Sequence, residues 1–244
     1  MSTILRLEGI HYRYPGSPGP ALRGVDLAIE TGLKVAIVGR NGSGKSTLFL
    51  HCNGILRPDR GRVLLDGSPV GYDRLSLTEL RRSVGIVFQN PDDQLFSASV
   101  AQDIAFGPLN LGLSEQVARR RVQSAAEDCG IADLLDRPTH SLSGGEKARV
   151  ALAGVLAMEP RVLLVDEVTG SLDPWMRRQM LTILGRLATS GKAVVMATHD
   201  MAIARRWADL LVVMDGGRIV ASGAPESIFG DAALASTILP PDPW

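Results

Sequence analysis

The stretch Gly39-Arg40-Asn41-Gly42-Ser43-Gly44-Lys45-Ser46 fits the pattern G-x-x-x-x-G-K-[ST] of phosphate-binding loops. It follows the apolar run Val35–Val38 and precedes a helical-looking stretch, so it occupies a strand-to-helix turn. The glycines allow backbone N–H groups to turn toward phosphate oxygens, and the next helix adds its positive end. Lys45 would reach the β- and γ-phosphates, and the Ser46 hydroxyl could ligate Mg²⁺. The alternative, a turn that binds nothing, is disfavoured because pattern and context agree.

A second apolar run, Val162–Val165, ends in the paired carboxylates Asp166 and Glu167. Asp166 would hold Mg²⁺ through water, and Glu167 could polarise an attacking water. His199 follows another predicted buried strand and could contact the γ-phosphate or hold that water. Acids at a strand end are often only a polar turn, and a lone histidine there is usually structural. These assignments therefore depend on the phosphate-binding loop.

The pattern along the rest of the chain predicts an α/β fold with a helical insertion. Short apolar runs without strict alternation indicate strands covered on both faces, as in a parallel sheet. The expected strands are 4–10, 25–29, 35–38, 63–65, 84–88, 162–165, 193–197 and 210–214. Helices are expected over 77–83 behind a Ser76–Glu79 capping box, from Ser114 to Gly130, and from Asp173-Pro174 to near Gly191. Between Pro91 and about Pro160 only helix signals occur.

Composition narrows the class of protein. The 244 residues are 45% hydrophobic and 21% charged, and 26 basic residues balance 26 acidic ones. This balance disfavours a protein held to DNA by many phosphate contacts, so no nucleic-acid partner is expected. No apolar run approaches the ~20 residues of a membrane span, and the N-terminus lacks a secretory signal. Two cysteines form no disulfide framework. We expect a cytosolic chain that could reach a membrane through a partner.

The run Leu142-Ser143-Gly144-Gly145-Glu146 narrows the class further. Ser143 and Glu146 form a capping box, so a well-capped helix is the plain interpretation. Two glycines in that first turn lower the helix propensity, which is explained if the backbone there must come close to another group. The run resembles the Leu-Ser-Gly-Gly-Gln signature of the ATP-binding cassette (ABC) family. The other family motifs occur in order over nearly the whole chain: Gly39–Ser46, Gln89, the signature, Asp166-Glu167, Ser171-Leu172-Asp173 and His199.

The resemblance implies a P-loop NTPase (RecA-like) core with an antiparallel β-subdomain and an inserted α-helical subdomain. A single cassette is expected over 3–235, with core and β-subdomain at about 3–88 and 160–225, the helical subdomain at about 89–159, and a tail at 236–244. Family members close head-to-tail around two ATP molecules and hydrolyse them.

The resemblance also assigns roles to residues. Tyr14 matches the aromatic residue that stacks on adenine, with a plain strand aromatic as the alternative. Gln89 would reach Mg²⁺ and the catalytic water, alongside Glu167 and His199. Asp173 would lie at the dimer interface. The implied ATP contacts are Tyr14, Gly39, Arg40, Asn41, Gly42, Ser43, Gly44, Lys45, Ser46, Thr47, Ser143, Gly144, Gly145, Glu146 and Asp173, and the implied Mg²⁺ ligands are Ser46, Gln89 and Asp166.

Several positions depart from the family pattern. Glu146 and Ala148 replace the usual glutamines, Val168 replaces a common proline, and Gly170-Ser171 reorders the usual small residues. Glu146 should repel a triphosphate unless it caps its own helix or meets an arginine. No departure removes a catalytic group, so active hydrolysis is still expected.

The segments Asn90–Phe96 and Asp103–Pro108 resemble the ATPases of energy-coupling-factor importers, most closely the cobalt and nickel branch. This resemblance implies a homodimer bound to integral membrane subunits, peripheral on the cytoplasmic face, that powers Co²⁺ or, next, Ni²⁺ import. The main rival is the ATPase of another importer or exporter. A cassette ATPase acting on nucleic acid is disfavoured by the short helical insertion, and a kinase or GTPase would lack Leu142–Glu146.

Overall fold

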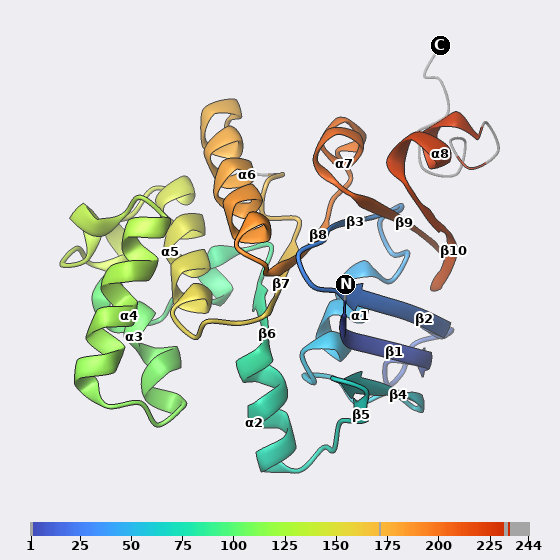
Figure 1. The fold of residues 1–244 in the computed structure, drawn as a ribbon, viewed down its shortest axis with the longest axis horizontal. Coiled ribbons are helices and arrows are strands. Elements are labelled where there is room, and N and C mark those ends of the chain that lie inside the picture. The colour runs from blue at the N-terminus through green and yellow to red at the C-terminus, as the bar shows by residue number, and fades with distance from the viewer. Residues whose placement is uncertain (1, 171, 232–233, 235–244) are drawn as a thin grey trace.

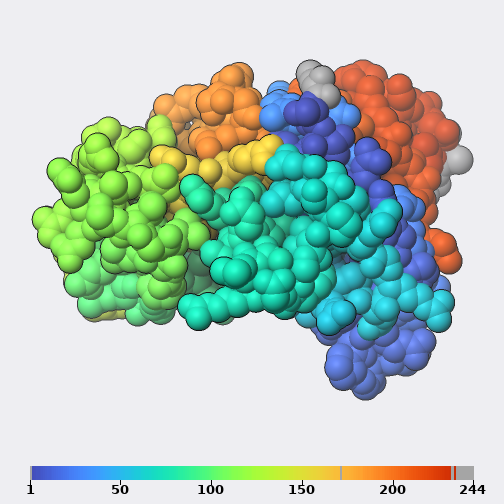
Figure 2. All heavy atoms as spheres, turned by 60° about the horizontal axis from the view of Figure 1, so that its bottom comes forward, coloured from blue at the N-terminus to red at the C-terminus, as the bar shows by residue number. Residues whose placement is uncertain are grey.

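The computed structural model describes residues 2–170, 172–231 and 234. Ser171, which belongs to one predicted motif, and the predicted tail 236–244 lie outside the described residues. Two β-sheets and helices α7 and α8 occupy one side of the molecule, and helices α3, α4 and α5 form a lobe on the other (Figure 1). Figure 2 shows the yellow-green atoms of this lobe gathered at one end.

The elements follow one another in this order: β1 (Thr3–Tyr12), β2 (Leu22–Glu30), β3 (Lys34–Val38), α1 (Lys45–Cys52), β4 (Arg60–Leu65), β5 (Ser68–Pro69), α2 (Arg74–Ser83), β6 (Val84–Val87), η1 (Pro91–Asp93), α3 (Val100–Asn110), α4 (Glu115–Asp128), η2 (Ala132–Leu134), η3 (Thr139–Ser141), α5 (Gly144–Leu156), β7 (Val162–Asp166), α6 (Pro174–Thr189), β8 (Ala193–Ala197), α7 (Met201–Trp207), β9 (Leu210–Asp215), β10 (Arg218–Gly223) and α8 (Pro225–Gly230).

The larger sheet positions the site. Its six strands lie in the order β10-β9-β3-β8-β7-β6, and all of them pair in parallel except β10. Every residue of β7 and β8 is buried, as the continuous apolar runs predict for strands covered on both faces. Because β3, β8 and β7 are neighbours and parallel, the loops that follow them meet at one edge of the sheet.

A smaller antiparallel sheet, ordered β2-β1-β4-β5, lies beside α1. The alternating burial of β2 turns Leu22, Val25, Leu27 and Ile29 into the core. There they join Leu48 and Phe49 of α1 in one apolar cluster. The cluster fixes α1, and therefore the loop before it, between the two sheets.

The helical lobe forms where the sequence predicts only helices. Each of its long helices begins at a serine whose side chain accepts a backbone N–H: Ser99 for α3, Ser114 for α4 and Ser143 for α5. Val122 of α4 and Val150 of α5 belong to one apolar cluster that continues into β7. The bounds given for the subdomains stay a prediction.

The predicted start of α2 is wrong. The capping box of Ser76 and Glu79 placed it at Leu77, whereas the helix begins at Arg74 with Asp73 as its N-cap. The Asp73 carboxylate accepts the N–H groups of Leu75 and Ser76 and also the Ser76 hydroxyl. A carboxylate satisfies several donors of the first turn at once, so it prevails over the serine.

An ion pair ties the smaller sheet to the larger one. Arg161, just before β7, donates two hydrogen bonds of 2.5 and 2.8 Å to Asp66 in the turn after β4. These bonds lower the pKa of Asp66 below its ordinary value of 3.8. Both side chains are about half exposed, so the pair contributes little despite its bidentate geometry.

We expect Asp66→Asn to lower the free energy of unfolding at neutral pH by about 0.5–1 kcal/mol. Because the folded-state pKa is lowered, this contribution is present above the unfolded pKa and is lost as pH falls through the folded value. Urea unfolding of both proteins should therefore show a gap in stability at neutral pH that closes as the pH falls below the ordinary value of 3.8. The control is Asp136→Asn, at an exposed carboxylate without an ion pair among the described residues. A gap independent of pH would contradict this account.

Among the described residues, no helix has the length and apolar character needed to cross a membrane.

Candidate functional site

The phosphate-binding loop has a backbone that only glycine allows at two positions. Gly44 has a φ of 105°, and a Cβ atom there would lie 2.9 Å from the Ala21 carbonyl oxygen. A Cβ atom at Gly39 would collide with the Met214 carbonyl oxygen. The loop therefore lies close against the backbone of two neighbouring segments, and α1 begins at Lys45 directly after it.

Lys45 is 5% exposed, and its ammonium group points into the loop. Its Nζ donates to the Gly39 carbonyl at 2.9 Å and to the Arg40 carbonyl at 3.4 Å. It also lies 3.4 Å from Oε1 of Glu167. A buried cation surrounded by carbonyls and one carboxylate is ready to exchange these partners for a more highly charged anion.

Glu167 connects the ends of two neighbouring strands, β7 and β8. It follows β7, its backbone N–H donates to the Ala197 carbonyl at the end of β8, and its Oε2 lies 3.4 Å from Nδ1 of His199. Its φ of 49° is a left-handed conformation that costs energy for a non-glycine residue. Such strain is typical of functional sites, and here it places the carboxylate between Lys45 and His199.

Asp166 precedes Glu167 and is 6% exposed. Burial raises its pKa above the ordinary value, a hydrogen bond with the Ser46 hydroxyl opposes this, and the Glu167 charge adds to it. Its Oδ1 atom is buried without a hydrogen-bond partner among the described residues. A buried carboxylate oxygen with free lone pairs beside a hydroxyl fits a Mg²⁺ ion, which prefers oxygen ligands.

This arrangement predicts that Asp166→Asn stabilises the protein without nucleotide. Because the folded-state pKa is raised, ionisation of Asp166 disfavours the folded state as the pH rises above the ordinary, unfolded value, so removal of the charge should help at neutral pH. We expect a gain of about 1 kcal/mol, or about 2–4 °C in Tm. The same variant should lose most of the stabilisation that Mg²⁺ and ATP give the parent in thermal unfolding. Asp215→Asn, at the exposed end of β9, is the control. A lower Tm for Asp166→Asn without ligand would contradict this prediction.

Lys45 and Glu167 line a pocket of about 370 Å³, whose lining includes neither Asp166 nor His199. Among the predicted residues, it is lined by Tyr14, Asn41, Gly42, Gly44, Lys45, Ser46, Thr47, Gln89 and Glu167. The hydroxyl of Tyr14 lies 3.2 Å from the Thr47 hydroxyl. Gly39 and Arg40 contribute the carbonyls that hold Lys45, and the Ser43 hydroxyl is buried without a hydrogen-bond partner among the described residues. The roles of these residues stay predictions.

The structure does not bring the signature to this pocket. Ser143, Gly144, Gly145, Glu146 and Asp173 are absent from its lining, and Ser143 instead caps α5. Asp173 caps α6 by accepting the Met176 N–H at 2.9 Å. Within one copy of the chain, the predicted ATP contacts therefore form two separate groups.

Glu146 resolves the repulsion that its charge predicts. Its Oε2 accepts the Ser143 N–H at 2.7 Å, and its Oε1 lies 3.2 Å from Nη1 of Arg137. The Ser143 N–H lowers the pKa of Glu146 most, and the Arg137 charge adds to this. The carboxylate thus caps its own helix and meets an arginine. Two other departures, Ala148 and Val168, are buried in the apolar cluster of the helical lobe and β7.

Sequence reasoning missed the polar contacts that fasten the segment around Gln89, from Phe88 to Gln94, to the helical lobe. Gln94 accepts the Phe88 N–H at 3.1 Å and donates to the Ala151 carbonyl at 3.3 Å. Lys147 of α5 pairs with Asp92 at 2.6 Å. A glutamine in a short irregular segment carries no linear signal for such a role.

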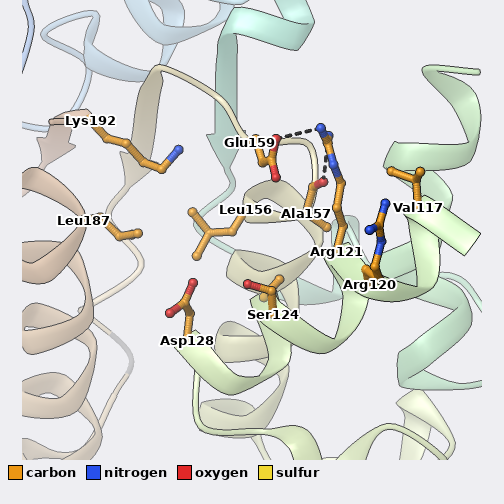
Figure 3. Close-up of a pocket in the computed structure, with 11 residues that line it drawn as sticks. Val117, Arg120, Arg121, Ser124, Asp128, Leu156, Ala157, Glu159, Leu187 and Lys192 are labelled. Carbon is orange, nitrogen blue, oxygen red and sulfur yellow. Dashed lines mark hydrogen bonds and ion pairs between the residues drawn. The ribbon is translucent and has the colours of Figure 1, made fainter. Parts of the chain in front are cut away.

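Another pocket, of about 500 Å³, lies between α4, the end of α5 and Lys192 (Figure 3). Two of the cations that line it already have partners. Arg121 pairs with Glu159 at 2.6 Å (Figure 3), and Lys192 donates to the Pro160 carbonyl at 2.8 Å. It contains none of the residues predicted for ATP. The pocket at the phosphate-binding loop is the candidate site.

A parallel sheet with a phosphate-binding loop after one strand and an acidic pair after a nearby strand defines a P-loop NTPase. The comparisons with known proteins narrow this class. The family described as "ABC transporter" matches residues 22–170, and the chain belongs to it. The predicted fold class and the resemblance to cassette ATPases are thereby confirmed, and the chain is an ATP-binding cassette ATPase.

Similar proteins and solved structures support the assignment to this family. The chain is 50% identical to a cobalt import ATP-binding protein CbiO of Rhodobacter capsulatus, over 96% of this chain and 83% of that protein. It is 46% identical to an energy-coupling factor transporter ATP-binding protein EcfA2 of Methanospirillum hungatei, over 96% of this chain but only 58% of that protein. The structure of cbiO1 from Clostridium perfringens, described as part of the ABC transporter complex cbiONQ, superimposes with a TM-score of 0.85 at 45% identity, covering 95% of this chain and 92% of that one. An ATP-binding cassette solved as a dimer with ADP and Pi gives a TM-score of 0.82 at 26% identity, covering 91% of this chain and 99% of that one.

Proposed function

We propose that this chain hydrolyses ATP at the phosphate-loop pocket and powers the import of a transition-metal ion, Co²⁺ first and Ni²⁺ second, through membrane partner subunits. The observation that carries the ATPase step is that Glu167, which lines the pocket with Lys45, contacts both Lys45 and His199. The names of the relatives support the importer and the ion. The ATPase of an importer for a vitamin or another solute is the second candidate, favoured by the relatives named for energy-coupling factors.

The residues suggest how hydrolysis proceeds. Backbone N–H groups of the loop and Lys45 bind the β- and γ-phosphates, which requires Lys45 to leave Glu167. The oxygen of a water molecule attacks the γ-phosphorus. The bond between the γ-phosphorus and the β–γ bridging oxygen breaks, and its electron pair stays on the oxygen of the leaving ADP. The freed Glu167 carboxylate takes the proton of the water, and His199 orients this carboxylate through its Nδ1 atom.

Mg²⁺ fits beside this pocket. Ser46 and Asp166 would hold it together with Gln89, which lines the pocket as Ser46 does, and the ion would neutralise charge on the β- and γ-phosphates. Asp166 must then be ionised, which its burial resists when the ion is absent.

The second group of predicted contacts fits a second copy of the chain. A signature that lies outside its own pocket can complete the pocket of a partner in a head-to-tail dimer, with Asp173 near the junction. Gly144 has no heavy atom within 4 Å of an added Cβ, so its backbone is open to such a partner. The helix N-terminus at Ser143 would then bind the γ-phosphate.

The membrane partners would dock at a groove of about 370 Å³ between α2, α3 and α5. Phe96 and Phe106 lie in it, 65% and 47% exposed, with their rings packed edge to face. Gln94 lines the same groove and holds the backbone beside Gln89. A short amphipathic helix of a membrane subunit fits this continuity between groove and pocket. The chain would thus lie peripherally on the cytoplasmic face of the membrane.

The test is transport by the reconstituted complex. The chain and its membrane partners are placed in vesicles with ATP, and uptake of Co²⁺, Ni²⁺ and a vitamin is measured, with Glu167→Gln as the inactive control. We expect ATP-dependent uptake of Co²⁺, weaker uptake of Ni²⁺ and none with the variant. Vitamin uptake without uptake of either metal would contradict the choice of ion and favour the second candidate.

A further inference from the structure

Three aromatic rings form a continuous stack beside the candidate ATP pocket. Tyr14, which lines the pocket, packs edge to face against Tyr12 with 5.0 Å between ring centroids. Tyr12 packs in the same way against His51, at 4.8 Å. His51 is fully buried, whereas Tyr14 is 38% exposed. The stack therefore runs from the core of the protein to the open wall of the pocket.

The other end of this stack is fastened to α1. His51 lies one turn after Thr47, and its Nδ1 lies 2.7 Å from the Thr47 carbonyl oxygen. Because a carbonyl only accepts, Nδ1 carries the proton and His51 donates. The hydroxyl of the same Thr47 lies 3.2 Å from the Tyr14 hydroxyl. One residue of α1 is thus bonded to both ends of the aromatic stack.

A plain packing role does not explain the choice of histidine. Its Nε2 atom is buried without a hydrogen-bond partner among the described residues, which costs free energy that an apolar side chain would avoid. Leu48, Phe49 and Cys52, which are fully buried on the same helix, are apolar. What histidine adds is an N–H that fixes the plane of the ring, and therefore the angle at which Tyr12 meets it.

We infer that His51 is a positioning residue that, through Tyr12 and together with Thr47, holds the Tyr14 ring in place to stack on the nucleotide base. This inference deepens the proposed function, because it rests on ATP binding at this pocket. Helix α1, which carries Lys45 to the phosphates, would thereby also hold the Tyr14 ring in position. It would therefore fix the distance between the base and phosphate subsites.

The experiment compares ATP with inorganic tripolyphosphate, which has no base. Dissociation constants of both are measured by calorimetry in the presence of Mg²⁺ for the full chain and for His51→Leu. We expect His51→Leu to weaken ATP about threefold to tenfold and to leave tripolyphosphate unchanged. In a Tyr14→Ala background, His51→Leu should have no further effect on ATP. Tyr12→Leu should reproduce the loss from outside α1, and Tyr12→Phe, which keeps the ring, should not.

The control for general damage to α1 is Cys52→Ala, a fully buried neighbour outside the stack. It should lower stability while the ratio of the two dissociation constants stays at the parent value. Equal weakening of both ligands by His51→Leu and Tyr12→Leu, or an undiminished effect in the Tyr14→Ala background, would overturn the inference. Failure of the parent to bind ATP at all would instead overturn the proposed function.

Discussion

Glu167→Gln is expected to lower the rate of ATP hydrolysis by about 10²–10⁴-fold, the usual contribution of a positioned general base. ATP binding should survive and become tighter, for an electrostatic reason. The Glu167 carboxylate lies 3.4 Å from the Lys45 ammonium and competes for it with the incoming phosphate. Glutamine keeps the shape of the side chain but removes both the base and the competing charge. The measurements are phosphate release at saturating ATP and the dissociation constant of ATP.

The control for this variant is Glu159→Gln, which removes an equal charge from a carboxylate outside the pocket that pairs with Arg121. It should leave both quantities near the parent values. Hydrolysis by Glu167→Gln at the parent rate would exclude Glu167 as the base. Weaker ATP binding would show that the ion pair with Lys45 supports the loop instead of competing with phosphate.

The part of the fold that local chemistry dictates was predictable from the sequence. Continuous apolar runs predict buried parallel strands. The capping residues Ser114, Ser143 and Asp173 predict where helices α4, α5 and α6 begin. Strand β10 was missed because its residues are exposed or half-buried at a sheet edge, so no apolar run marks it. The start of α2 was misplaced because two capping residues compete there.

Part of the candidate site could also be predicted from the sequence, and part could not. Lys45, Glu167 and His199 follow strands that are neighbours in a parallel sheet, so their meeting follows from topology once the strands are identified. The sequence could not show which residue pairs with Glu146. Arg137 reaches it across the irregular segment η3, where no period relates sequence distance to position. The structure also shows that the charge of Glu146, which departs from the family pattern, is balanced by the Ser143 N–H and by Arg137.

The second large effect is expected at the signature. Gly144→Asp places a carboxylate where the γ-phosphate of a partner copy would bind, and we expect hydrolysis to fall about a hundredfold. The fold should tolerate the change, because an added Cβ at Gly144 meets no heavy atom within 4 Å. Gly144→Ala is the matched control and should lose far less activity. Gly145 is unsuitable, because its Cβ position is occupied by Met176.

Mixing variants then tests whether two copies share one site. Lys45→Ala damages the phosphate-binding loop and Gly144→Asp the signature, so each variant alone should be nearly inactive. In a head-to-tail dimer of one copy of each, one pocket carries both defects and the other carries none. With random pairing in an equal mixture, about a quarter of all pockets are intact, and about a quarter of the parent rate should return. If each pocket were complete within one copy, no pairing could restore an intact site. The mixture would then stay at the mean of the two variants, and the head-to-tail proposal would be wrong.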